Sequence, residues 1–286
     1  MNEAFSPRLE SVLDAARPLA ALFAAEGHRL YLVGGVVRDH LLDRVPSAPD
    51  LDATTDAHPP AIKRILAGHA EAVWTQGERF GTIGCTIDGQ TWEITTHRAE
   101  SYEEASRKPA VAFGDRIEDD LVRRDFTVNA MAIDLHDRVL IDPYGGRDDL
   151  GVGVLRTPLD PEVSFSEDPL RMLRAARFHA GYDLEPVPEL VGAITAMVGR
   201  MAIVSTERIR DELEKLVLLD DPAPGLRLLV VTGLLGAVLP ALDAGEIDAA
   251  AARVAEMPAD PALRWAALLL RAEVTGRDLA GMRFSR

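Results

Sequence analysis

The sequence has a single cysteine and few histidines, which narrows the chemistry that the chain can carry. Cys85 has no second cysteine to pair with, so an internal disulfide is excluded and a reducing, cytoplasmic environment fits best. The seven histidines are scattered and, with one cysteine, give none of the ligand spacings of a zinc site. We therefore expect neither a disulfide-stabilised fold nor a zinc centre.

Long apolar runs are also missing. The most apolar stretch, residues 228–239, is too short to cross a bilayer and is interrupted by Thr232, Gly233 and Gly236. The N-terminal segment lacks the apolar core of a signal peptide and is predicted to be an amphipathic helix, because charges interrupt it at Glu3, Arg8, Glu10, Asp14 and Arg17. We predict no membrane partner and infer no stable protein partner.

Positive charge is in deficit, since 31 Lys and Arg residues face 46 Asp and Glu residues and the formal net charge is −15. This balance argues against a protein that coats nucleic acid nonspecifically. It remains compatible with an enzyme that holds one RNA end through a local basic patch. The candidate patches lie around Arg98, Arg107–Lys108 and Arg208–Arg210.

The order of strand-like and helix-like segments predicts an α/β region followed by an all-α region. Before Pro158 we predict strands at 30–33, 51–55, 82–87 and 92–96, helices at 36–42 and 60–67, and a hairpin turn at Asp88-Gly89. Residues 99–120 are rich in charge and small side chains, which predicts a mobile loop. After Pro158 the apolar spacing is helical, at 167–179, 189–198, 206–219, 224–235 and 261–274.

Gly34-Gly35 follows the first predicted strand directly. A strand that ends in two glycines and passes into a helix lets backbone N–H groups approach a phosphate, and Arg38 would add charge one turn later. On its own a two-glycine turn is a weak signal, and a plain strand–helix turn with a surface arginine explains it better.

Asp50-Leu51-Asp52 carries the sharper chemical prediction. Residues two apart on a strand point to the same face, so both carboxylates converge, and such a pair is costly unless a cation lies between them. Magnesium prefers carboxylate oxygens. The pair follows the glycine turn closely in the sequence, and a phosphate cradle beside a metal site is suited to phosphoryl transfer. The alternative is an exposed strand edge with two solvated acids.

Two later segments suit contacts with a nucleotide. Arg123-Arg124-Asp125 fits phosphate or ribose-hydroxyl contacts, although an ordinary helix start explains it equally well. In 166–171, Ser166 is a predicted N-cap, and Asp168 and Arg171 are predicted to share a helix face. A carboxylate plus a guanidinium complements the pairing edges of cytosine and adenine and mismatches those of uracil and guanine. A plain acid–arginine pair in a first helical turn is the alternative.

Together these stretches resemble the class II tRNA nucleotidyltransferases, the CCA-adding enzymes, and their relatives the bacterial poly(A) polymerases. Each match is weak alone, but they occur in the family's order and cover most of 30–216. The matching stretches are LVGGVVRD (32–39), DLDATT (50–55), EITTHRAESY (93–102), RRDFTVNAMAID (123–134), DPYGGRDDL (142–150), EDPLRMLRAARF (167–178) and STERIRDELEKL (205–216).

The resemblance implies a nucleotidyltransferase head of the polymerase-β type, with a mixed sheet and helices, at residues 1–157. It implies a helical neck at 158–219 and the start of a helical body at 220–286. It also implies that Asp50 and Asp52 are the catalytic ligands of two Mg²⁺ ions, with Glu93 on a strand that could reach them. The implied nucleotide-binding residues are Gly34, Gly35, Arg38, Arg124, Asp125, Asn129, Asp168, Arg171, Arg174 and Arg177.

The implied reaction is template-independent addition of C and A from CTP and ATP to the 3′ end of tRNA. Residues 77–83 resemble the CCA-adding pattern more than that of the poly(A) enzymes, and the loop at 99–120 favours complete CCA or terminal A addition over CC alone. Arg174 and Arg177 suit RNA phosphate contacts or intrahelical ion pairs equally well. His97 stands where the family usually has phenylalanine.

Family members continue well past a segment like 282–286, so we expect this chain to lack the part that holds the tRNA elbow. A poly(A) polymerase is one alternative function. A nucleotide- or RNA-binding fragment with little turnover is another, and in a third reading the acidic pair is purely structural.

Overall fold

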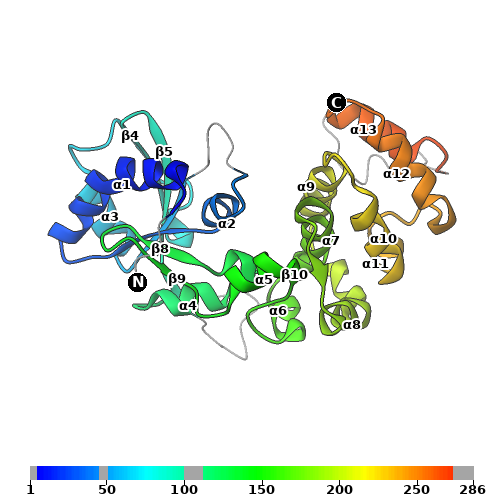
Figure 1. Ribbon diagram of the computed structural model, residues 1–286, viewed down its shortest axis with the longest axis horizontal. Helices are drawn as coiled ribbons and strands as arrows, with labels where there is room; N and C mark the ends of the chain where they lie inside the picture. Colours follow the sequence, from blue (N-terminus) through cyan, green and yellow to red (C-terminus); the bar gives the residue numbers. More distant parts are fainter. Residues whose placement is uncertain (1–4, 45–50, 100–111, 273–286) are drawn as a thin grey trace. The chain divides into compact units, whose positions relative to one another are not determined.

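The computed structural model describes residues 5–44, 51–99 and 112–272, and the chain divides into two compact units, Met1–Asp148 and Asp149–Arg286 (Figure 1). We call these the sheet unit and the helical unit. Helix α5 (Gly146–Val152) crosses the division. The boundaries at 157 and 219 stay predictions. Among the helices of the described residues, none combines the length and the apolar character that crossing a membrane requires.

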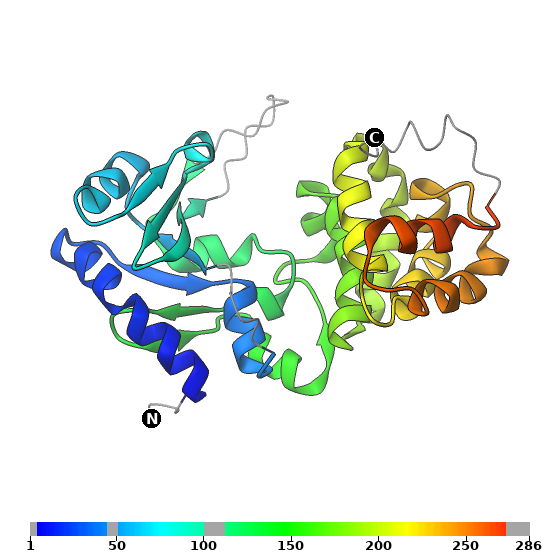
Figure 2. The same cartoon turned by 90° about the horizontal axis from the view of Figure 1, so that it is seen from above.

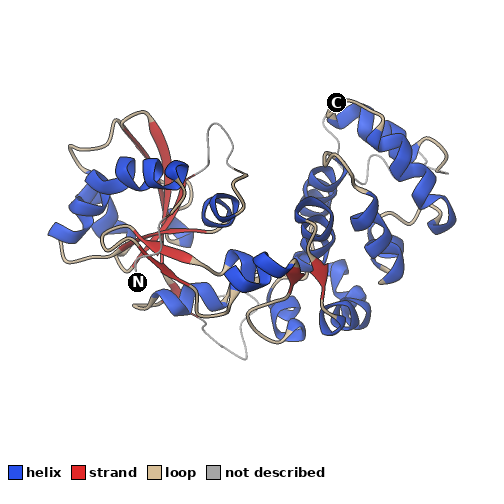
Figure 3. Ribbon diagram, viewed as in Figure 1, coloured by secondary structure: helices blue, strands red, loops and turns tan. Residues whose placement is uncertain are grey.

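The sheet unit is built on one mixed sheet of seven strands in the order β3-β4-β5-β2-β1-β8-β9 (Figure 3). β2 and β5 pair in parallel, while their other neighbours in the sheet pair antiparallel. A separate short pair joins β6 and β7. The strands are β1 (Leu30–Val33), β2 (Leu51–Thr55), β3 (Ala72–Trp74), β4 (Thr82–Ile87), β5 (Gln90–Thr96), β6 (Arg98–Ala99), β7 (Ala112–Phe113), β8 (Ala132–Asp134) and β9 (Val139–Ile141).

One face of this sheet is covered and the other is only partly covered. On the covered face the side chains of β2, β4 and β5 are buried, among them Ala53, Ile83 and Ile94. Helices α1 (Pro7–Ala25) and α3 (Pro59–Leu66) contact each other and pack on the sheet unit's strands (Figure 2). The apolar stripe of α1 begins after Ser6, which caps the helix by accepting a hydrogen bond from Leu9 N.

On the opposite face, and within the described residues, α4 (Ile117–Val122) covers the half that is formed by β1, β8 and β9. Ile117 and Leu121 pack there with Val33 and Ala132. The rest of this face, over β2, β5 and β4, carries exposed acids and partly exposed threonines. We call it the open face. The remaining short helices of the unit are α2 (Gly35–Leu41), η1 (Glu78–Phe80) and η2 (Thr127–Asn129).

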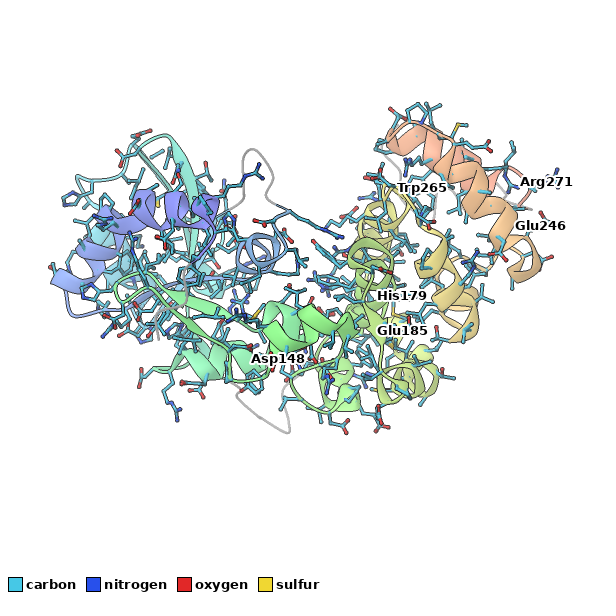
Figure 4. All side chains as sticks on the ribbon, viewed as in Figure 1. Asp148, His179, Glu185, Glu246, Trp265 and Arg271 are labelled. Carbon is cyan, nitrogen blue, oxygen red and sulfur yellow. The ribbon has the colours of Figure 1, made fainter. Side chains whose placement is uncertain are left out.

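The helical unit packs its helices around a core that includes Phe165, Phe178, Ile194 and Leu229. Trp265, labelled in Figure 4, lies on the last helix of the described residues. Its Nε1 donates to Glu214 of the helix at 206–217, at 3.3 Å, and so links these two helices. Its elements are β10 (Val154–Leu155), α6 (Pro161–Glu167), α7 (Leu170–Tyr182), β11 (Glu185–Pro186), α8 (Pro188–Met197), η3 (Val198–Ile203), α9 (Thr206–Val217), α10 (Ala223–Val231), α11 (Leu234–Val238), η4 (Ala244–Glu246), α12 (Ile247–Ala255) and α13 (Pro261–Leu269).

The predicted α/β region followed by an all-α region is confirmed, and so is the hairpin at Asp88-Gly89. Both turn residues have positive φ, 49° and 72°, and Ile87 pairs with Gln90 on either side of them. The small parallel pair of β10 and β11 was not predicted, because two-residue strands leave no alternating pattern in the sequence.

Four local predictions are wrong, the last of them in part. The segment 167–179 is not one helix, since α6 ends at Glu167 and α7 begins at Leu170. Asp168 precedes a proline and is extended, with φ −142° and ψ 99°, so Ser166 lies inside α6 and is not an N-cap. The predicted helix 224–235 breaks at Gly233, which is left-handed. Of the predicted loop 99–120, residues 100–111 lie outside the described residues, and the described part contains the end of β6, the strand β7 and the start of α4.

Candidate active site

Two acids face the open side of the sheet from neighbouring strands. β2 and β5 are parallel and in register, with Asp52 opposite Glu93, and both residues are exposed. Directly opposed residues on paired strands present their side chains to the same face, so these carboxylates are neighbours. Asp50, the first of the predicted pair, lies outside the described residues. In the part of the chain that the structure describes, no three acid, histidine or cysteine side chains gather as a ready-made metal site.

The glycine turn after β1 lies beside Asp52, as the sequence predicted. Gly34 has φ 75° and ψ −137°, a conformation that side chains disfavour, and it caps the start of α2. A Cβ at this position would lie 3.2 Å from Arg124 Nη1 and 3.9 Å from Asp52 Oδ2. The turn, the acid and the arginine therefore meet in one place, although they are distant in the sequence.

Arg38 is buried and is not the surface arginine of the simpler interpretation. Its Nη1 donates to Asn129 Oδ1 at 2.5 Å, and its Nε donates to Asp39 at 2.9 Å. Asn129 Nδ2 in turn donates to Asp125 Oδ1 at 2.8 Å, which also accepts from Phe126 N. Three of the predicted nucleotide-binding residues thus form a connected, largely buried network that holds α2 against the segment after α4.

Arg124 is held by an acid that the sequence did not single out. Its Nη2 forms an ion pair with Asp120 Oδ2 at 2.9 Å, one turn earlier on α4. The backbone N–H of Arg98 donates to the other oxygen of Asp120 at 3.4 Å. Since i, i+4 pairs are common on helices, only the tertiary contact with the glycine turn marks this arginine as part of the site.

His97 is buried beneath the open face. Its Nδ1 lies 2.9 Å from Thr54 Oγ1, and this hydroxyl donates to the Thr95 carbonyl, so the imidazole is the donor to Thr54. Burial lowers the pKa of His97, and the nearby carboxylate of Asp120 opposes that shift only in part. A phenylalanine at this position would fill the space but would lose the hydrogen bond.

In the helical unit, both members of the predicted base-reading pair have partners. Asp168 accepts from Leu170 N at 3.1 Å and from Arg208 Nη2 of α9 at 2.6 Å. Arg171 Nη1 donates to Ser164 Oγ at 2.8 Å and to Glu167 at 3.0 Å. Asp168 lies before α7, not on it, yet its carbonyl accepts from Arg171 N, so the two residues stay adjacent.

Arg174 and Arg177 flank the buried ring of Phe178 on α7. Their guanidinium carbons lie 5.8 Å and 4.7 Å from its centre. Arg177 also donates to Glu212, which is only 3% exposed. That ion pair joins α7 to α9, so for Arg177 the intrahelical alternative is wrong. Arg208 and Glu212 were missed as partners because nothing in a single sequence pairs a side chain with a distant one.

Comparison with known proteins gives two family matches, and both families are described as parts of polymerases. Residues 30–156 match the family described as poly A polymerase head domain, and residues 183–246 match the family described as "Probable RNA and SrmB- binding site of polymerase A". The chain is 39% identical over 210 residues to the CCA-adding enzyme of Bacillus subtilis, covering 73% of this chain and 51% of the relative. For the CCA-adding enzyme of Bacillus licheniformis, the values are 38% over 246 residues, 86% and 60%.

Among solved structures, the fold is similar to that of the Bacillus stearothermophilus CCA-adding enzyme in complex with CTP. The TM-score is 0.81 and the sequence identity is 32%, and the match covers 98% of this chain and 67% of that one. A tRNA-processing enzyme in an apo form matches with a TM-score of 0.78 at 25% identity, over 100% of this chain and 77% of that one. The chain spans about half the length of the curated relatives it matches.

Proposed function

Because the chain belongs to the family of tRNA nucleotidyltransferases and poly(A) polymerases, we propose that it adds C and A nucleotides from CTP and ATP to the 3′ end of tRNA without a template. The observation that carries this proposal is the meeting of Gly34, Asp52 and Arg124 at one place on the open face. A close backbone turn, an acid and a cation are what a bound triphosphate requires.

A divalent cation fits the acids of this face. Asp52 and Glu93 are exposed carboxylates in register, and hard cations such as Mg²⁺ take carboxylate oxygens. We propose Asp50 and Asp52 as the ligands of two Mg²⁺ ions, with Glu93 next to them. When bound, the metal would activate the RNA 3′-hydroxyl and neutralise the departing pyrophosphate.

The chain's own residues would orient the nucleotide. Gly34 leaves room for the triphosphate next to Arg124, since any side chain there would displace this guanidinium. Arg38, Asn129 and Asp125 hold each other in place, and Asp125 would contact the ribose from that network.

Base selection is assigned to Asp168 and Arg171. The carboxylate would accept from the amino group of cytosine or adenine, and the guanidinium would donate to the ring nitrogen beside it. Asp168 accepts from Arg208 in an ion pair, and a carboxylate has further lone pairs that can accept from the amino group of a base. We propose the neck at 158–219 as the region that carries this selection, following the head at 1–157.

The test is primer extension with each nucleotide supplied separately, on tRNA that ends at the discriminator base. CTP and ATP should be incorporated, and UTP and GTP poorly. Asp52→Asn should lower the rate about 100- to 1,000-fold by removing a charged ligand. Asp137→Asn, which removes an exposed acid paired with Arg29, is the matched control and should retain activity.

Either of two outcomes would contradict this proposal and indicate a different function. Long A tails from ATP alone on generic RNA would identify a poly(A) polymerase, the activity in the name of the matched head family. Nucleotide binding without extension at high protein concentration would identify a binding fragment, in line with the partial coverage of the curated relatives.

A further inference from the structure

Two phenylalanines are exposed at one end of the sheet, where η1 leads into β4. Phe80 and Phe113 expose 46% and 36% of their surface. In a chain with 5% aromatic residues, two exposed rings at one place form a local aromatic surface that could bind a ligand. Of the other phenylalanines among the described residues, Phe5 is partly exposed, and the buried ones are Phe23, Phe126, Phe165 and Phe178.

Gly81 brings these two rings into one patch. It follows Phe80 directly, has φ +87° and ends η1. A Cβ at this glycine would lie 2.7 Å from Phe113 Cε1, so the Phe113 ring lies against the Gly81 backbone. His58 meets the same ring edge-on, with centroids 5.0 Å apart. Phe80, Phe113 and His58 are all exposed.

Two arginines accompany the rings. The Arg79 guanidinium lies 4.5 Å from the centre of the Phe80 ring, and Arg98 Nε donates to the Phe80 carbonyl at 3.1 Å. Within the described ranges neither arginine forms an ion pair with a carboxylate. Although acids outnumber bases in this chain, both arginines lie beside the exposed rings, and cations next to aromatic faces suit an anionic ligand.

This patch is continuous with the open face. Arg98 Nη2 lies 3.5 Å from Thr82 Oγ1, which lies 2.9 Å from Thr95 Oγ1. Thr95 is two residues beyond Glu93 on β5, so it points to the same face, about 7 Å further along the strand. A chain of contacts therefore leads from the exposed rings to the acids.

We infer that these residues, His58, Arg79, Phe80, Arg98 and Phe113, form a stacking patch that binds single-stranded RNA. Bases would stack on Phe80 and Phe113, and the two arginines would contact the phosphates. Exposed rings interleaved with cations suit unpaired nucleotides, because every base has a stacking face and a duplex does not offer it. The identification of this RNA as the unpaired 3′ segment of the substrate rests on the proposed function; the binding itself does not.

The experiment measures the affinity of the 286-residue chain for a fluorescein-labelled single-stranded RNA dodecamer by anisotropy, with a blunt RNA hairpin for comparison. Phe80→Ala and Phe113→Ala should each weaken binding about 5- to 150-fold, the range for losing one stacked base. Phe80→Tyr should bind as wild type, whereas Phe80→Leu, which keeps the apolar bulk, should not. Val73→Ala removes a comparably exposed apolar side chain from β3 and is the matched control.

Two further readouts separate this inference from the proposed function. Asp52→Asn should keep full RNA affinity while losing nucleotide addition, and Phe80→Ala should keep its affinity for CTP. If wild type binds the dodecamer and Phe80→Ala does not, the stacking patch stands even when no extension is seen. Equal RNA affinity for wild type, Phe80→Ala and Phe113→Ala, with all three folded by circular dichroism, would overturn it.

Discussion

In the sheet unit, the register of two paired strands places Asp52 beside Glu93, whereas in the helical unit side chains help the backbone to hold Asp168 and Arg171. The register of β2 against β5 sets the first pair. The second pair also depends on side chains, because Asp168 accepts from Arg208, and Arg171 donates to Ser164 and Glu167.

Because of this difference, the two pairs of residues should respond to different perturbations. Ladder hydrogen bonds are shared over whole strands, so only changes to the backbone or to buried groups move the acids of the sheet unit. Exposed ion pairs contribute little stability and are screened by salt, so the geometry of the helical unit's pair should respond to ionic strength. The ion pair of Arg177 and Glu212 is an exception in that unit, because the Glu212 side chain is only 3% exposed.

The largest effect is expected from breaking the ion pair between Arg177 and Glu212. Glu212→Ala leaves the Arg177 guanidinium, 16% exposed, without its carboxylate in the contact between α7 and α9. We expect a loss of about 3–5 kcal/mol in the free energy of unfolding of the helical unit. Urea unfolding followed by circular dichroism measures it. Asp248→Ala breaks the exposed pair with Arg227 and, as the control, should cost less than about 1 kcal/mol. Equal costs would remove the distinction between buried and exposed pairs.

The next effect tests whether backbone geometry alone sets the turn beside Asp52. Gly34→Ala places a Cβ 3.2 Å from Arg124 Nη1 in a conformation that alanine disfavours, so both stability and triphosphate affinity should fall. We expect about 1–3 kcal/mol of destabilisation. Gly68→Ala is the control, because it has φ +79° but no heavy atom within 4 Å. It should lose stability and keep its affinity for CTP. A loss of CTP binding in both variants would contradict a local role for Gly34.

Local patterns made much of the sheet unit predictable. Leu30–Val33 with the glycines after it, the alternation in Leu51–Thr55 and the Asp88-Gly89 turn each act over a few residues, and the structure has a strand, a strand and a hairpin there. The nearness of the glycine turn to Asp52 followed from the same order of elements. The roles of these residues in catalysis remain predictions.

What the sequence did not reveal depends on pairing between distant segments. Asp168 was expected on a helix, but the following proline favours extended backbone there, and the helix breaks. Arg208 reaches Asp168 across 40 residues, and Asn129 reaches Arg38 across 91. No periodicity marks such contacts in one sequence, so the partners that hold the candidate site could be found only in the fold.

A smaller effect concerns base selection in the helical unit. Arg208→Ala removes the donor to Asp168 Oδ2 and leaves the bond from Leu170 N to hold this carboxylate, so its position becomes less fixed. The ratio of CTP to UTP incorporation should fall about twofold to tenfold, the value of one hydrogen bond, with little change in Mg²⁺ dependence. Single-nucleotide extension measures the ratio, and Arg208→Lys should restore part of it. Arg227→Ala, on an exposed pair in the same unit, should not change it. A uniform loss with all four nucleotides would instead assign Arg208 to RNA binding.

The smallest effect is a pH dependence in the sheet unit, and it arises from buried groups and not from exposed pairs. Burial lowers the pKa of His97 and of His40, so the unfolded chain binds protons that the folded unit does not, just below the ordinary histidine pKa of about 6.5. Stability therefore rises with pH through that window and is lost as pH falls below it, with a slope that each histidine can raise by at most about 1.4 kcal/mol per pH unit.

His97→Phe should flatten this dependence between pH 7.5 and about 5.5, because one of the two buried imidazoles is gone while Thr54 keeps its bond to the Thr95 carbonyl. Urea unfolding at several pH values measures the slope. His136→Gln, which removes an imidazole that is 56% exposed, is the control substitution. If His97→Phe keeps the wild-type slope, the imidazole must already be compensated in the fold by the acids near it. The sheet unit would then depend on side-chain charge as much as the helical unit does.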